Sequence, residues 1–215
     1  IVSTYSNLGM ALTGLLVQEQ SKIPFGNYIR DNIFQPLDMM NSFYEFPKDS
    51  SNLTANPFYP MPMVRSAADG SSYTKIENFG QYLQAAPTGG IWSTADDMAN
   101  YALMHLNYGT SPQTGAQILS NATARQMYAQ QFNNGDMLGM GYVWLQNRAF
   151  DVPYIAHGGV LPPYYSDLSL FHEANAGIFM TMVGTDPTAL SILKAKFMSL
   201  TMFNTTCTGP LQSFV

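Results

Sequence analysis

The chain has 215 residues and a formal net charge of −5; 46% of its residues are hydrophobic and only 11% are charged. A chain this apolar is not disordered, and with no basic run it does not suit nucleic acid or an anionic membrane surface as a partner. No apolar stretch reaches the roughly 18–20 residues that cross a bilayer. The length suits one sizeable domain or a substantial part of a larger one.

The first predicted element is a helix that opens at the triplet Tyr5-Ser6-Asn7. Four leucines follow at the spacing of one helix face: Leu8, Leu12, Leu15 and Leu16. We therefore expect an amphipathic helix that is anchored in a core, with Tyr5 and Asn7 at its exposed end. Asn is a favourable N-cap, so the triplet alone is consistent with a simple cap or with two side chains that hold a substrate.

The elements predicted next are helices, then strands, then one more helix. A helix over 25–34 ends before Pro36, and an irregular segment over 45–87 carries short strands near 61–64 and 81–83. A glycine turn leads into a helix capped by Thr94, with Asp97 in its first turn, and another helix runs from Ser120 to about Gln130. Strands are expected over 142–145, 154–156, 167–171 and 177–183, and a last helix over 187–203. This order is typical of an α+β fold.

The three histidines have different expected environments. His105 falls on the apolar face of the helix that Thr94 begins, so we expect it in the core, and His172 lies at a turn, which predicts a surface position. His157 is followed by Gly158 and Gly159 at the end of a strand. Glycines there let another molecule approach the strand edge, and an imidazole can carry a proton near neutral pH, although ordinary turns also contain this triplet.

Three Asn-x-Thr sequons, at Asn52, Asn121 and Asn204, favour a glycosylated protein that is secreted or luminal. Cys207 is the only cysteine, which excludes an internal disulfide and a cysteine-based metal cluster. This thiol either pairs with a cysteine outside the chain or is buried and free.

Taken together, these motifs resemble a known family. Tyr5-Ser6-Asn7, the segment 86–98 (Ala-Pro-Thr-Gly-Gly-Ile-Trp-Ser-Thr-Ala-Asp-Asp-Met), Gly-Met-Gly-Tyr-Val-Trp at 139–144 and His157-Gly158-Gly159 occur in this order. The order is similar to that of the serine β-lactamase and penicillin-binding-protein superfamily, in particular its class C β-lactamase-related, LACTB-like branch. Only residues 45–85 match poorly. The resemblance implies a β-lactamase/transpeptidase-like α+β fold, an antiparallel sheet flanked by helices, with residues 1–215 as the C-terminal portion of a single domain.

The resemblance also implies roles for individual residues. Tyr5 would be the general base or proton relay, and Asn7 would bond the substrate amide or orient the lysine of the nucleophile motif. His157 would replace the family lysine of the third motif, while Gly158-Gly159 keeps the strand edge clear. The N–H of Val160 would be an oxyanion-hole donor. A phenol is a poor base at neutral pH unless nearby cations favour its anion, which a lysine or a protonated histidine would do.

The nucleophile motif departs from this pattern. Ser-x-x-Lys occurs only as 72–75 and 191–194, both after Tyr5, whereas the family places it upstream. We therefore expect the nucleophile on an N-terminal segment that is missing from this chain and that accompanies it as a partner. Cys207 is a candidate for a disulfide tether between the two.

The sequence thus predicts a serine hydrolase that acts by forming an acyl-enzyme on a small-molecule or peptide substrate, a small ester, amide or peptide. No metal or organic cofactor is expected. The alternative is a catalytically inactive member of the same family with a binding or structural role; an intact upstream Ser-x-x-Lys would favour the enzyme.

Overall fold

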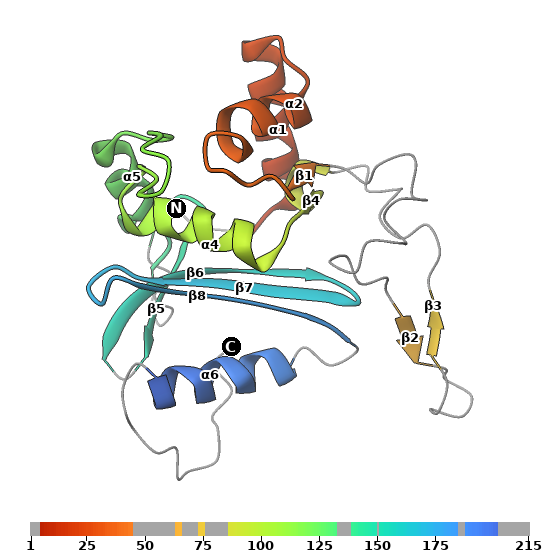
Figure 1. Cartoon of the computed structure of the whole chain (residues 1–215), viewed down its shortest axis with the longest axis vertical. Helices are drawn as coiled ribbons and strands as arrows, with labels where there is room; N and C mark the ends of the chain where they lie inside the picture. The colour runs from red at the N-terminus through yellow and green to blue at the C-terminus, as the bar shows by residue number, and fades with distance from the viewer. Residues whose placement is uncertain are drawn as a thin grey trace.

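The structure is a computed structural model that describes residues 5–44, 63–65, 73–75, 86–132, 139–149, 151–184 and 188–201. Its centre is a four-stranded antiparallel sheet in the order β5–β6–β7–β8. The strands are Leu145–Ala149, Val152–Leu161, Tyr164–Phe171 and Ala176–Val183. Figure 1 shows helix α4 (Ala95–Leu106) over one face of this sheet and α6 (Thr188–Thr201) over the other. The predicted α+β order and the flanked antiparallel sheet are confirmed.

The two faces of the sheet carry separate apolar cores because successive side chains of a strand point to opposite sides. On the α4 side, Ile155, Leu168 and Leu170 pack with Ala102 and Leu106 of the helix. On the other side, a second cluster includes Met198 of α6 and four sheet residues: Tyr154, Ala156, Phe171 and Ile178. Both faces of the sheet are therefore covered.

A shielded ion pair anchors α6 to the sheet. Lys194 Nζ lies 2.8 Å from Oδ1 of Asp167, and both side chains are less than one-fifth exposed. The hydroxyl of Ser169 also donates to this carboxylate, at 2.7 Å. The pair fixes the 191–194 segment on the sheet face opposite α4.

The smaller elements form the N-terminal part and the remaining connections. Helix α1 (Asn7–Ser21) is followed by α2 (Phe25–Ile29). Helix α2 continues into one π-helical turn, η1 (Arg30–Phe34), and the two together form the single helical segment predicted over 25–34. The short strands pair as β1 (Phe43–Tyr44) with β4 (Ile91–Trp92) and as β2 (Met63–Arg65) with β3 (Tyr73–Lys75). The 3₁₀ turn η2 (Ala86–Thr88) precedes β4, and α5 (Asn121–Tyr128) follows α4.

The predicted orientation of α1 is wrong. Its leucines face outward, with exposed fractions of 70% for Leu8, 57% for Leu12, 51% for Leu15 and 58% for Leu16. The helix instead packs through its small face, where Gly14 is its buried residue and lies against Pro87 and Phe25. A glycine allows this close approach, so the leucines are turned away from the described core.

Helix caps follow the sequence signals, with one change at α1. Ser6 is the N-cap of α1 and its hydroxyl accepts from the N–H of Gly9 at 3.0 Å, so the cap does not use the side chain of Asn7. Thr94 caps α4 and Ser120 caps α5, as predicted.

Asp97 ties the turn before β1 to α4. It is 3% exposed, and its Oδ2 accepts from the N–H of Asn41 at 2.9 Å and from the hydroxyl of Ser42 at 2.6 Å. A buried carboxylate needs such donors, since burying it without them would be costly. The acidic residue predicted for the first turn of α4 therefore also positions β1.

The strand predicted over 142–145 begins only at Leu145. Val143 has a φ of 62°, a left-handed conformation that interrupts an extended strand. The turn brings Trp144, 4% exposed, into the core under α4. Within this apolar run only Trp144 is buried, while Tyr142 and Leu145 are exposed.

His105 lies in this core, as predicted, and is 1% exposed. Its Nδ1 lies 2.6 Å from the hydroxyl of Tyr128, which also donates to the backbone carbonyl of His105. His172, predicted at the surface, is half-buried instead. Its Nε2–H donates to the same carbonyl at 3.2 Å, and its ring stacks at a tilt against Tyr108 and Tyr128. The turn position was right, but the aromatic surroundings cover the side chain.

These surroundings favour the neutral form of the His105 and His172 side chains at pH 7. Burial, with a smaller contribution from the charge of His172, lowers the pKa of His105 to about 3. Burial also lowers the pKa of His172, helped by the charge of Arg125, against the opposing hydrogen bond to the His105 carbonyl.

We expect acid to destabilise the protein through this cluster. The unfolded chain takes up a proton at His105 below about pH 6.5, whereas the native chain does so only near pH 3, so the free energy of unfolding falls as pH falls between these values. The loss from His105 approaches about 1.4 kcal/mol per pH unit. Urea unfolding from pH 7 to 4 measures it. In His105→Gln the slope should be shallower than in the wild type; equal slopes would exclude His105 as the source.

The packing of α1 predicts opposite effects for two glycines of the same helix. A Cβ on Gly14 would lie 2.5 Å from Cβ of Pro87, whereas a Cβ on Gly9 meets its nearest atom at 3.5 Å. Gly14→Ala should lower the free energy of unfolding by roughly 1–3 kcal/mol through overpacking. Gly9→Ala should raise it by up to about 1 kcal/mol through helix propensity. Urea unfolding measures both; stabilisation by both would show that α1 does not pack on Pro87.

Candidate active site

The candidate site lies where strand β6 extends past its neighbour. Strand β5 pairs with β6 only up to Ala156, opposite Leu145, whereas β7 pairs with β6 as far as Leu161. Among the described strands, residues 157–161 therefore have a partner on one side only. The open side presents backbone groups that another extended segment can pair with.

Tyr5 and His157 meet at this open edge, although 152 positions separate them in the sequence. Their ring centroids are 6.5 Å apart and the ring planes are tilted by 31°. Tyr5 comes just before the N-cap of α1 and is 64% exposed, while His157 is half-buried on β6. Tyr5 is thus held at the exposed end of a helix, as predicted, and its ring faces solvent beside an imidazole.

The two glycines after His157 have different surroundings. An added Cβ on Gly159 would lie 2.5 Å from the hydroxyl oxygen of Ser166, its partner on β7, whereas a Cβ on Gly158 meets its nearest atom, a backbone oxygen, at 3.5 Å. Gly159 therefore makes room for Ser166, and Gly158, which is exposed, leaves the surface open. The predicted role of these glycines in keeping the edge clear for a substrate stays a prediction.

Asn7 and Val160 complete the predicted set. Asn7 is exposed in the first turn of α1, two residues after Tyr5, so one helix end carries both side chains. Val160 is 73% exposed and lies three residues after His157, so strand alternation places its side chain on the opposite face of the sheet. The role of its N–H in an oxyanion hole stays a prediction.

The sequence did not indicate that aromatic rings from three different strands gather beside the β6–β7 turn. Trp92 of β4 meets Tyr164 edge to face at 5.5 Å, and Phe43 of β1 stacks on Trp92 at 6.3 Å. Tyr164 pairs with Leu161, so it shares a sheet face with His157. Burial raises the pKa of Tyr164 to about 12, which makes this phenol a neutral contact and not a base. Strand alternation over 164–168 was the signal that could have placed Tyr164 and Ser166 on this face.

The other predicted residues lie away from this edge or outside the described ranges. Asn121 is exposed as the first residue of α5, and its Oδ1 accepts from Nε of Arg125 at 2.8 Å. Ser191 belongs to α6, and its Lys194 is engaged by Asp167 on the far face of the sheet. Outside the described residues lie Asn52, Ser72, Asn204 and Cys207. Glycosylation, secretion and the disulfide tether stay predictions.

The described part of the chain contains neither a candidate membrane span nor a candidate metal cluster. None of its helices is both long and apolar enough to span a bilayer. Within the same ranges, His, Cys, Asp and Glu side chains do not gather in threes as a metal site would need.

What these groups can do follows from their types. A phenol and an imidazole at this separation can pass a proton through one substrate atom or a water between them. The open strand edge can align an extended substrate by backbone hydrogen bonds. The hydroxyl of Ser6, the residue between Tyr5 and Asn7, is engaged in the helix cap. The arrangement therefore brings together groups of the acid–base type and a strand edge that can bind an extended segment.

Known proteins are similar to this chain over most of its length. Beta-lactamase-like protein 2 of Dictyostelium discoideum is 26% identical over 182 residues, which are 82% of this chain and 30% of that protein. The octameric penicillin-binding protein homologue from Pyrococcus abyssi superposes with a TM-score of 0.77 at 18% identity, over 96% of this chain and 44% of that one. A class C beta lactamase from Rhodobacter sphaeroides gives a TM-score of 0.67 at 13% identity, over 94% of this chain and 60% of that one.

These superpositions confirm the β-lactamase/transpeptidase-like fold. The chain spans less than two thirds of each of these proteins, as little as 30% of the Dictyostelium protein. The family model described as Beta-lactamase matches residues 2–201, nearly the whole chain and including Tyr5 and His157. The chain therefore belongs to the beta-lactamase family, within the serine β-lactamase and penicillin-binding-protein superfamily.

Proposed function

We propose that this chain forms part of a serine hydrolase that works through an acyl-enzyme. The observation that carries the proposal is the meeting of Tyr5 and His157 at the open edge of β6, with ring centroids 6.5 Å apart. Two motifs that are 152 positions apart in the sequence meet there. The chain belongs to the beta-lactamase family, which supports an interpretation of the two motifs as parts of one active site.

In the proposed mechanism a serine hydroxyl attacks the carbonyl carbon of the substrate. Tyr5 accepts the proton of the serine and passes it to the leaving group, so the alcohol or amine departs and the acyl-enzyme remains. A water then attacks the acyl carbon by the same route and frees the serine. His157 stabilises the negative charge on the phenol oxygen when it is protonated, and Asn7 orients the substrate amide.

The serine and its lysine lie, in this proposal, on a segment of the protein beyond this chain. Ser191 cannot take this role without leaving α6, because Lys194 holds that helix to the far face of the sheet through Asp167. Other described cations are also engaged elsewhere: Lys22 with Glu19, Arg30 with Asp31, and Arg125 over the ring of Tyr108. In this proposal the lysine that accompanies the nucleophile assists Tyr5 together with protonated His157.

The site favours a substrate with an extended acyl part, such as a small ester, amide or peptide. Backbone groups of 157–161 offer pairing along one edge, and the exposed Gly158 leaves room for a close approach. The rings of Trp92 and Tyr164 provide an apolar surface beside the β6–β7 turn. A substrate with an apolar group about four strand residues away from the scissile bond fits this arrangement.

Tyr5→Phe tests the proposal in the protein assembled with its nucleophile-bearing segment. Removal of the hydroxyl should lower both kcat and kcat/KM for a chromogenic ester or penicillin-type substrate by about 10²–10⁴-fold, the usual contribution of a general acid–base. Steady-state kinetics measure it, and an unchanged thermal unfolding midpoint shows an intact fold. Tyr28→Phe, the same change on α2, should leave both constants within about twofold. Unchanged turnover in Tyr5→Phe would remove Tyr5 from the mechanism.

A further inference from the structure

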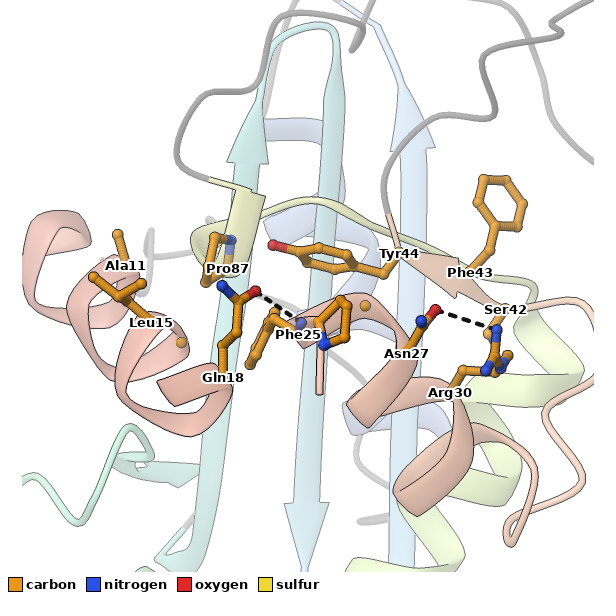
Figure 2. Close-up of a pocket in the computed structure, with 13 residues that line it drawn as sticks. Ala11, Leu15, Gln18, Phe25, Asn27, Arg30, Ser42, Phe43, Tyr44 and Pro87 are labelled. Atoms are coloured by element: carbon orange, nitrogen blue, oxygen red, sulfur yellow. Dashed lines mark hydrogen bonds between the residues drawn. The ribbon is translucent and has the colours of Figure 1, made fainter. Parts of the chain in front are cut away.

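A cavity separate from the candidate active site lies beside α1. It has a volume of about 580 Å³ and is lined by residues of α1, α2, β1 and η2 and of the turns next to them. Figure 2 shows α1 on one side of it and Phe43 with Arg30 on the other. Among the described residues, Tyr5, Asn7 and His157 are not part of this lining. Cavities of about 300–1,000 Å³ are typical of small-molecule sites.

The apolar walls of the cavity depend on two glycines. An added Cβ on Gly26 of α2 would lie 2.7 Å from Cδ1 of Tyr44, and one on Gly14 of α1 would lie 2.5 Å from Cβ of Pro87. The glycines therefore allow the Tyr44 ring to lie against α2 and Pro87 to lie against α1. The rings of Phe25 and Tyr44 meet edge to face, with centroids 5.1 Å apart. These packed rings offer a preformed apolar surface to a planar group.

The side-chain amides at the cavity can donate hydrogen bonds. Oε1 of Gln18 accepts from the N–H of Phe25 at 3.2 Å, and Oδ1 of Asn27 accepts from a guanidinium nitrogen of Arg30 at 3.3 Å. Within the described ranges, no protein group accepts from either amide nitrogen. Figure 2 shows the nitrogen of Gln18 turned away from the bond to Phe25. Each amide nitrogen carries two N–H groups, so these side chains can bind an acceptor oxygen.

The remaining polar groups of the lining are engaged or compensated. The hydroxyl of Ser42 donates to Asp97 at 2.6 Å and lies 2.7 Å from the hydroxyl of Ser93. Arg30 forms an ion pair with Asp31 and its side chain is 52% exposed, so its charge is compensated and screened by solvent. Among the described residues, no Asp or Glu lines the cavity. The cavity therefore favours an acceptor oxygen over a donor or a cation.

We propose that this cavity is a binding site for a small planar molecule with an apolar ring system and an acceptor oxygen, of the aromatic amide or aromatic carboxylic acid class. The ring system lies between Pro87 and the rings of Phe25 and Tyr44, and the oxygen accepts from the amide nitrogen of Gln18. Binding here needs neither a nucleophile nor turnover, so it stands apart from the proposed hydrolase.

Ligand-observed NMR titrations of the full-length protein test the site, with 2-naphthamide and 2-naphthoate as probes. Gln18→Glu keeps an oxygen for the N–H of Phe25 but replaces the amide N–H donors by a carboxylate. It should weaken 2-naphthamide at least about threefold, as the loss of one hydrogen bond does, and 2-naphthoate by more, because two carboxylates repel. Gln20→Glu makes the same change at an exposed position of α1 outside the cavity, and should leave both affinities within about twofold.

A second pair of variants tests the location of the ligand. Ala11 lines the cavity, so Ala11→Phe places a ring in the space of the ligand and should lower both affinities at least about tenfold. Thr13→Phe adds the same ring at an exposed position of the same helix, and should leave both affinities within about twofold. Thermal unfolding midpoints show that each variant is folded.

Failure of both probes to bind the wild-type protein would overturn the inference, as would binding that Ala11→Phe leaves unchanged. Weaker binding in Ala11→Phe with no change in Gln18→Glu would keep the site and overturn the role of Gln18. Turnover of a chromogenic ester reports separately on the proposed function. Binding that depends on Gln18 in a protein without turnover would contradict the hydrolase and leave this site intact, whereas turnover without binding would do the reverse.

Discussion

The site depends on the unequal lengths of two neighbouring strands. Strand β6 continues for five residues beyond Ala156, where β5 ends its pairing, and β7 supports this extension along its whole length. The extension is rigid because its other edge is paired, and it is accessible because one edge is open. His157 is the first residue of the extension, so the imidazole stands at the boundary between the packed sheet and the open edge.

The second constraint is how α1 reaches that edge. Gly14 lets the helix lie close against Pro87. Ser6 caps the N-terminus of the helix, next to the open edge of β6. Tyr5 is thereby placed beside His157 by backbone packing and capping, while its own ring remains exposed. The same packing turns the leucines of α1 outward, so it also leaves an exposed apolar surface on this helix.

Much of the fold follows from local signals in the sequence. Thr94 and Ser120 cap the helices they were predicted to cap, and the apolar periodicity after Thr94 placed His105 in the core. The order of motifs indicated the family, and with it the pairing of Tyr5 with His157, which no local signal contains.

What the sequence could not provide are the features that depend on partners in space. Periodicity identifies an apolar face but not what covers it, so the leucines of α1 were assigned to a core that the described residues do not form. The left-handed turn at Val143 contradicts the propensity of a β-branched residue, and His172 is covered by rings from α5 and from the turn after α4. The wall of Trp92 and Tyr164 joins two strands that are distant in sequence.

We propose that this chain supplies the acid–base groups of a serine hydrolase and receives its nucleophile from elsewhere in the protein. The most direct measurement is covalent labelling of the assembled protein with a penicillin-type probe, followed by peptide mapping. Our account predicts one labelled serine in a Ser-x-x-Lys sequence outside residues 1–215. A label on Ser72 or Ser191 would contradict it.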